Sequence, residues 1–150
     1  MKLATTVVMT CVFGALSFTA NASSFGPPNA WASGWGQGVN EYVANNQYGD
    51  YLYIACDPYS HVKMTLNIGE HSYGSYDEKD FSLIIDGQEI QTPYETASRV
   101  GANNFYYLWD KLRTAETIVA KTSDGIHLEL PTKGAAEELP ESDSGCVTEF

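Results

Sequence analysis

The sequence predicts an α+β fold: an antiparallel β-sheet or sandwich of six or seven strands with one long helix packed on it. Three observations support this prediction. Several short segments alternate apolar and polar residues with a period of two, most clearly over 62–68. Only 103–114 shows a strong helical period. Asp86-Gly87 separates two apolar segments, as in a type I′ hairpin. Alternating strands with one strong helix favour the α+β class.

The first twenty-two residues have the pattern of a signal peptide. Lys2 supplies a positive charge, residues 3–18 are an apolar run, and Ala20-Asn21-Ala22 fits the small-x-small cleavage pattern. The run is short for a transmembrane helix and has no stop-transfer sequence after it. We therefore expect cleavage after Ala22 and a single domain, 23–150, in the periplasm.

The beginning of this mature chain, 23–38, is rich in Gly, Pro, Ser and Asn, which argues against both helix and central strand. Its aromatic residues are Phe25, Trp31 and Trp35. They either dock on the sheet as part of an N-terminal arm, which is our preferred interpretation, or form an exposed contact patch. A short strand is expected at 39–43.

The middle of the chain is predicted to contain most of the strands. The expected strands are 51–56, 62–68, 81–85 and 88–92, the last two joined by the Asp86-Gly87 turn. Residues 69–80 are polar and contain glycine, so we expect a loop there.

The predicted long helix, 103–114, places Phe105, Leu108, Trp109 and Leu112 at i, i+3, i+4 and i+7, on one face. Asn103 or Asn104 is expected to cap its first turn. Two further strands, 117–121 and 126–130, follow around a turn at 123–125. A short second helix is expected at 132–139, capped by Thr132 and stopped by Pro140.

Two cysteines remain after removal of the signal peptide, Cys56 and Cys146. An even number in an exported chain predicts one disulfide. Closing a loop of this length would stabilise the fold by at most about 4–5 kcal/mol in the chain-entropy description. The alternative, a thiolate nucleophile or metal ligand, has no Cys-x-x-Cys or nearby histidine to support it.

The chain is acidic, with 19 Asp and Glu against 8 Lys and Arg and a net charge of −11. Loss of Lys2 would bring the mature chain to 7 − 19 = −12. Nucleic acid and anionic membrane surfaces are disfavoured as partners, because both need a basic footprint. A basic protein partner would be attracted by the electrostatic field of this negative charge. The alternative interpretation is that the acidity only keeps an exported protein soluble.

No catalytic or cofactor motif is present in the sequence. A hydrolytic triad needs a nucleophile, a base and an orienting group, and Gly-x-Ser-x-Gly, His-Glu-x-x-His, phosphate-loop and dinucleotide patterns are all missing. The histidines are His61, His71 and His127. His61 and His71 flank one predicted strand, roughly 20–25 Å apart, too far to share a metal. We predict no enzyme activity, cofactor or metal site; a small secreted hydrolase that uses His61 or His71 is the rival hypothesis.

The predicted loop 69–80 is the candidate recognition site. Asp77, Glu78 and Asp80 could suggest a calcium site, but the EF-hand order is missing and solvated charges are favoured. The loop also combines tyrosine, which offers a large amphipathic contact area at small entropic cost, with carboxylates. The alternative is an ordinary surface loop. The predicted partner-binding residues are Glu70, His71, Tyr73, Tyr76, Asp77 and Glu78.

The order of motifs over 51–146 resembles that of small exported proteobacterial proteins. These motifs are the strand ending at Cys56, the Ile84-Ile85-Asp86-Gly87 hairpin, the helix with Leu108-Trp109, Leu130-Pro131-Thr132-Lys133-Gly134 and the closing Cys146. The order is similar to type VI secretion-associated periplasmic proteins, the invasion-associated locus B type and periplasmic immunity proteins.

The immunity resemblance implies a stoichiometric inhibitor, often a homodimer, that occludes the active cleft of a peptidoglycan-hydrolysing, lysozyme-like effector. It assigns no contact residue to a position in this chain. The alternative function is a non-catalytic structural or assembly module of a secretion or envelope complex.

Overall fold

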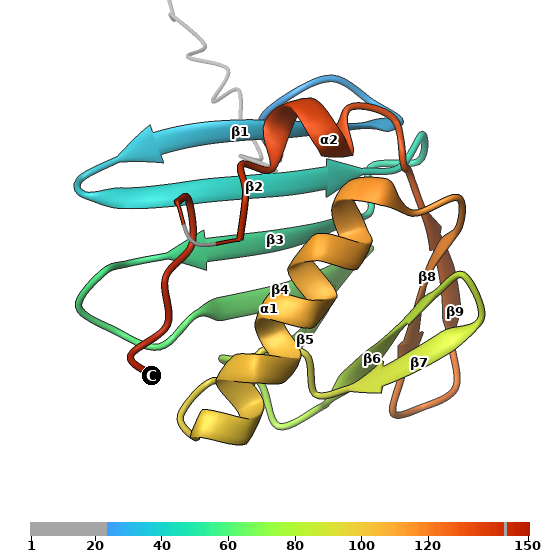
Figure 1. The fold of residues 1–150 in the computed structure, drawn as a ribbon. Helices are drawn as coiled ribbons and strands as arrows, with labels where there is room; N and C mark the ends of the chain where they lie inside the picture. The colour runs from blue at the N-terminus through green and yellow to red at the C-terminus, as the bar shows by residue number, and fades with distance from the viewer. Residues whose placement is uncertain (1–23, 143) are drawn as a thin grey trace, which may run out of the picture.

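A computed structural model describes residues 24–142 and 144–150, and it shows two antiparallel sheets and two helices (Figure 1). The predicted α+β class is confirmed, with nine strands in place of six or seven. The predicted signal peptide, 1–22, lies outside the described residues. The strands are β1 (Ala30–Gly36), β2 (Val39–Asn45), β3 (Tyr51–Cys56), β4 (Lys63–Ile68), β5 (His71–Gly74), β6 (Phe81–Ile85), β7 (Gln88–Gln91), β8 (Ile118–Thr122) and β9 (His127–Leu130). The helices are α1 (Arg99–Thr114) and α2 (Ala135–Glu138).

The larger sheet is a five-stranded meander in the order β1-β2-β3-β4-β5. Each strand pairs antiparallel with the next along the chain, with Leu52 opposite Leu66 and Ile54 opposite Met64. All four of these side chains are fully buried. The predicted period of two therefore positions one face of this sheet in the core.

The smaller sheet has four strands in the order β7-β6-β8-β9. Its first hairpin turns at Asp86 and Gly87, whose φ angles of 48° and 85° confirm the predicted type I′ turn. Helix α1 connects β7 to β8, and β8 then pairs with the free side of β6.

Helix α1 crosses the front face of the five-stranded sheet, with the four-stranded sheet beside it (Figure 1). The predicted apolar residues are buried as expected: Phe105, Leu108, Trp109 and Leu112. The helix begins earlier than predicted, because Ser98 is the N-cap and its hydroxyl accepts a hydrogen bond from the Gly101 N–H at 3.0 Å. Asn103 and Asn104 therefore lie within the helix.

The second helix is shorter than predicted. It begins after Gly134, which has a φ of 83°, and no side chain caps it. Thr132 therefore does not act as the N-cap, although its carbonyl accepts from the Ala135 N–H at 3.2 Å. The helix lies against β1, where Glu138 accepts hydrogen bonds from Ser33.

As predicted, residues 24–38 form neither a helix nor a central strand, but they include an edge strand, β1, that was not expected. Strand β1 forms because Gln37 and Gly38 adopt positive φ angles of 53° and 88°, which close a tight hairpin with β2. Trp31 is 2% exposed and its indole N–H donates to the Pro131 carbonyl at 2.8 Å, whereas Trp35 is 72% exposed. The two tryptophans thus divide between core and surface. Docking of the N-terminal arm is seen only for the residues before β1.

The predicted loop 69–80 also contains a strand. Gly69 has a φ of 58°, and with Glu70 it forms a two-residue turn that pairs His71 with Ile68. Strand β5 then continues to Gly74. Only the second half of the segment is a loop.

The predicted disulfide is confirmed, with Cys56 at the end of β3 bonded to Cys146 and their Cα atoms 5.1 Å apart. Hydrogen bonds hold the C-terminal segment at the same place, since Tyr42 and Asn40 both donate to the Gly145 carbonyl. Among the described residues, no helix has the length and apolar character needed to cross a membrane.

Candidate interaction surface

The outer face of the five-stranded sheet is the main candidate site. Both helices lie on the opposite, front face of this sheet (Figure 1). Strand register places Val43, Tyr53 and Thr65 in one outward row and Asn45, Tyr51 and Asn67 in the next. We refer to Tyr51, Tyr53 and Tyr76, together with Glu41 and Lys63 beside them, as the tyrosine face.

A hollow of about 310 Å³ lies in this face. One wall is the segment before β1, which Asn45 holds in place by donating to the carbonyls of Phe25 (2.8 Å) and Pro27 (3.2 Å). Gly26 permits this close approach, because it has a φ of 89° and a Cβ there would overlap the Ala32 Cβ. The residues lining the hollow are Ser24, Phe25, Val43, Tyr51, Tyr53, Thr65 and Asn67.

Tyr53 lies at the centre of the tyrosine face. Its hydroxyl donates to the Glu41 carboxylate on the neighbouring strand β2. Burial, followed by this hydrogen bond and the negative charge of Glu41, raises the pKa of Tyr53 well above the ordinary value of 10.0. Tyr51 and Tyr76 are close enough to raise the same pKa further. Tyr53 is therefore held as a neutral phenol in a fixed orientation.

Tyr76 extends the tyrosine face beyond the strands. The Lys63 Nζ lies 5.4 Å from the centroid of the Tyr76 ring, a cation–π contact. The Tyr76 side chain is 70% exposed. The face thus includes two aromatic rings from β3 and one from the loop after β5, which contacts a lysine of β4.

The residues predicted to bind a partner have different environments. Five are exposed: Glu70, His71, Tyr76, Asp77 and Glu78. Tyr73 is fully buried, because it lies opposite Leu66 on the inner face of the sheet. Its hydroxyl donates to Asp124 at 3.1 Å, and burial raises its pKa. Tyr73 therefore offers no exposed ring to a partner, which corrects our expectation for this residue.

Tyr51 and Tyr53 were missed as candidate contact residues, although the sequence carried a signal. They alternate with Leu52 and Ile54, so burial of the leucine and isoleucine directs the tyrosines to the other face of the strand. The sequence does not indicate whether another element covers that face.

The carboxylates of segment 69–80 accept hydrogen bonds from separate donors. Asp77 accepts from the Ser72 hydroxyl at 2.7 Å, and Asp80 accepts from the Tyr94 hydroxyl. Within the described part of the chain, no group of three or more His, Cys, Asp or Glu side chains is arranged to hold a metal ion.

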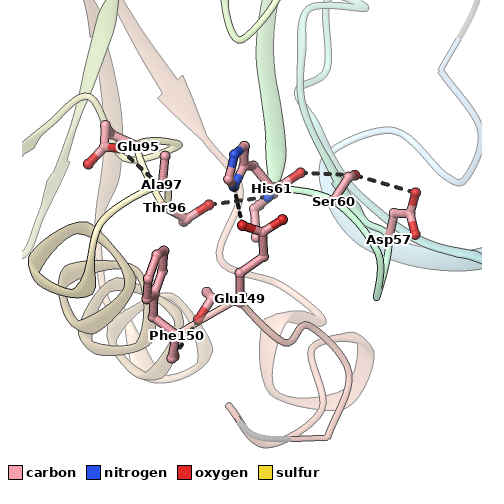
Figure 2. A network of polar contacts seen from close by, with 10 residues as sticks. Asp57, Ser60, His61, Glu95, Thr96, Ala97, Glu149 and Phe150 are labelled. Atoms are coloured by element: carbon pink, nitrogen blue, oxygen red, sulfur yellow. Dashed lines mark hydrogen bonds and ion pairs between the residues drawn. The ribbon is translucent and has the colours of Figure 1, made fainter.

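The one histidine–carboxylate ion pair among the described residues joins the loop before β4 to the C-terminus (Figure 2). The His61 Nδ1 lies 3.3 Å from a Glu149 carboxylate oxygen, and both side chains are almost half exposed. The nearby Ser60 hydroxyl donates to Asp57 at 3.3 Å or to the His61 carbonyl at 3.4 Å. Because Ser60 is not hydrogen-bonded to the imidazole, these contacts do not have the order of a nucleophile, base and orienting group. His71 lies at the other end of β4.

A polar cluster occupies the outer face of the four-stranded sheet. Ser82 donates to Glu89 at 2.7 Å, and the Lys121 Nζ lies 3.3 Å from the same carboxylate oxygen. The Ser82 hydroxyl, followed by Lys121, lowers the pKa of Glu89. These side chains satisfy one another, so the tyrosine face remains the stronger candidate for recognition.

Comparison with known protein families identifies the family to which this chain belongs. The sequence profile of the YfjT family matches residues 29–139. The chain belongs to the YfjT family. The match begins one residue before β1 and ends one residue after α2, so the YfjT region contains both sheets and both helices. It includes the whole tyrosine face but neither Cys146 nor Glu149. No curated protein and no solved structure matches the chain.

Proposed function

We propose that this YfjT-family chain is a periplasmic immunity protein, which binds a peptidoglycan-hydrolysing, lysozyme-like effector and inhibits it by occluding the active cleft. The observation that supports this proposal best is the tyrosine face, which contains a hollow that neither helix of the described residues covers. The binding surface would consist of that face and the exposed acidic residues next to it, Asp77 and Glu78.

The chemistry of the tyrosine face suits recognition of a protein. Tyrosine is enriched at interfaces because it buries a large apolar ring while its hydroxyl keeps a hydrogen bond. Tyr53 is already oriented by Glu41, so little conformational entropy is lost when it is covered. Thr65 and Asn67 add polar groups to the floor of the hollow.

The charge of the protein favours a basic partner. The exposed residues Asp77 and Glu78 directly follow Tyr76 in the chain, and the whole chain carries a net charge of −11. Cell-wall polymers carry carboxylates, so an enzyme cleft that holds them would offer cations to these acids. Complementary charge of this kind accelerates association and depends on salt.

The proposal can be tested with the purified mature protein. The protein is immobilised, exposed to periplasmic extract, and any captured hydrolase is assayed by the loss of turbidity of purified sacculi. We expect full inhibition at a 1:1 ratio, weakened at least tenfold by Tyr53→Ala or Tyr76→Ala. The control is Tyr107→Ala, an exposed tyrosine on α1, on the other side of the sheet.

Two results would contradict the proposal. One is turnover of sacculi by the protein itself, sensitive to His61→Ala or His71→Ala, which would favour a hydrolase. The other is a deletion strain that loses secretion but keeps its resistance to the effector, which would favour an assembly module of an envelope complex.

A further inference from the structure

Strand β9 presents a free backbone edge. It is the last strand of the four-stranded sheet and pairs with β8 alone. The Ile126 carbonyl accepts from the Thr122 N–H at 2.9 Å, and the Ile126 N–H donates to the Thr122 hydroxyl at 2.9 Å. The backbone groups of Ile126 therefore face β8. Since these groups alternate along an antiparallel strand, those of His127 and Glu129 face away from it.

The space beside this edge is partly bounded by the same chain. A hollow of about 420 Å³ lies between β9 and the turn between β2 and β3, where Tyr48 is 82% exposed. Among the described residues, no strand pairs with this side of β9. An exposed edge of this kind is a template for a further strand.

Two of the other sheet edges are covered in ways that β9 is not. On β1, the Trp31 N–H donates to the Lys133 carbonyl at 2.9 Å and the Ser33 N–H donates to the Glu138 carboxylate at 3.0 Å. On β5, the Gly74 N–H donates to the Lys79 carbonyl at 2.8 Å. These contacts occupy backbone donors at both edges of the five-stranded sheet.

We propose that β9 pairs with β9 of a second copy of this chain, antiparallel around a twofold axis at Leu128. The two four-stranded sheets would then form one continuous sheet of eight strands. In this register, His127 lies opposite Glu129 of the second copy, and the symmetry repeats the pair. The imidazole can donate to the carboxylate in each pair, and Leu128 lies opposite its own copy.

Other registers are less favourable. The outward backbone groups of His127 and Glu129 must pair with outward groups of the second copy, so the register can shift only in steps of two residues. A shift in one direction places His127 opposite His127. A shift in the other direction places Glu129 opposite Glu129 and brings in Pro131, which has no N–H to donate. The outer edge of β7 is less suited, because its corresponding residues are Glu89 and Gln91, and Glu89 already accepts from Ser82 and pairs with Lys121.

Cysteine trapping tests this register directly. Residues 128 of the two copies would form a non-hydrogen-bonded pair with Cα atoms about 4.5 Å apart, within the range of a disulfide. Leu128→Cys should therefore give a covalent dimer under mild oxidation, seen on a non-reducing gel. Ile126→Cys is the matched control and should not cross-link, because its counterpart is Leu130. Cross-linking of both variants, or of neither, would overturn the proposal.

Sedimentation equilibrium tests the pairing of His127 with Glu129 of the second copy without an introduced thiol. We expect the full mature chain to dimerise in a concentration-dependent way and His127→Glu to weaken the dimer at least tenfold. The double variant His127→Glu/Glu129→His exchanges the two residues and should restore dimerisation. Wild-type protein that stays monomeric at all accessible concentrations, or a swap that does not rescue, would contradict the proposal. Both positions are exposed, and a thermal melt checks that each variant is folded.

Discussion

The two faces of the five-stranded sheet differ in what covers them. On the inner face, Leu52 and Met64 are fully buried, in the same core cluster as residues of α1. On the outer face, Tyr51 and Tyr53 border a hollow on the side of the sheet away from α1 and α2. The same strands therefore supply stability on one side and the proposed recognition surface on the other. Substitutions on the two faces should separate these effects.

The largest effect on stability is expected on the inner face of the five-stranded sheet, which α1 covers. Leu108 is fully buried in α1. Leu108→Ala should lower the free energy of unfolding by about 2–5 kcal/mol, because it removes buried apolar contacts and leaves a cavity. Denaturant unfolding monitored by circular dichroism measures the change. A loss below about 1 kcal/mol would show that the helix is not tightly packed on the sheet.

The next effect concerns the disulfide that ties the C-terminal segment to β3. Replacing Cys56 and Cys146 with serine should cost about 2–5 kcal/mol, since the bond closes a long loop in the unfolded chain. The free energy of unfolding is measured for this variant and for wild type with and without reductant. Reduced wild type should match the double variant, and an unchanged midpoint would argue against a stabilising bond.

On the outer face, Tyr53→Phe should have a modest cost of about 0.5–1.5 kcal/mol at neutral pH, because the hydrogen bond to Glu41 is lost. It should also change the pH dependence. The pKa of Tyr53 is raised in the folded state, so its contribution to stability is complete below the ordinary pKa of 10.0 and is lost as pH rises through the raised value. Wild type should lose stability more steeply than the variant above pH 10. Identical alkaline profiles would contradict this.

Tyr76→Ala should affect stability least. The side chain is 70% exposed, so the free energy of unfolding should change by no more than about 0.5 kcal/mol. Binding to the captured hydrolase should nevertheless weaken at least tenfold, about 1.4 kcal/mol, as for an aromatic interface residue. Calorimetric titration measures the affinity, with Tyr107→Ala as the control. Equal losses for both variants would remove Tyr76 from the interface.

Sequence periodicity was sufficient to predict the elements whose apolar residues recur at a fixed spacing. The apolar face of α1, strand β3 and the Asp86-Gly87 turn follow from local pattern alone. The disulfide was predicted from the two cysteines that remain after the expected signal peptide, Cys56 and Cys146.

Tertiary contacts determine the parts that the sequence did not reveal. Strand β1 contains glycines and a serine, yet it is ordered by Trp31 contacts with the distant Pro131 and Lys133. The first turn of α1 depends on Gly101, where a Cβ would overlap Glu95. Tyr73 and Tyr76 have similar sequence surroundings, but strand register buries Tyr73, whereas Tyr76 lies in the loop after β5 and is exposed. The position of the site therefore required the fold.

Hydrogen exchange of the protein alone and in complex with its captured hydrolase tests the separation of the two faces most directly. We predict new protection in β3, in β4 and in the loop around Tyr76, with little change in α1. New protection confined to α1, with the strands of the tyrosine face unchanged, would contradict the account.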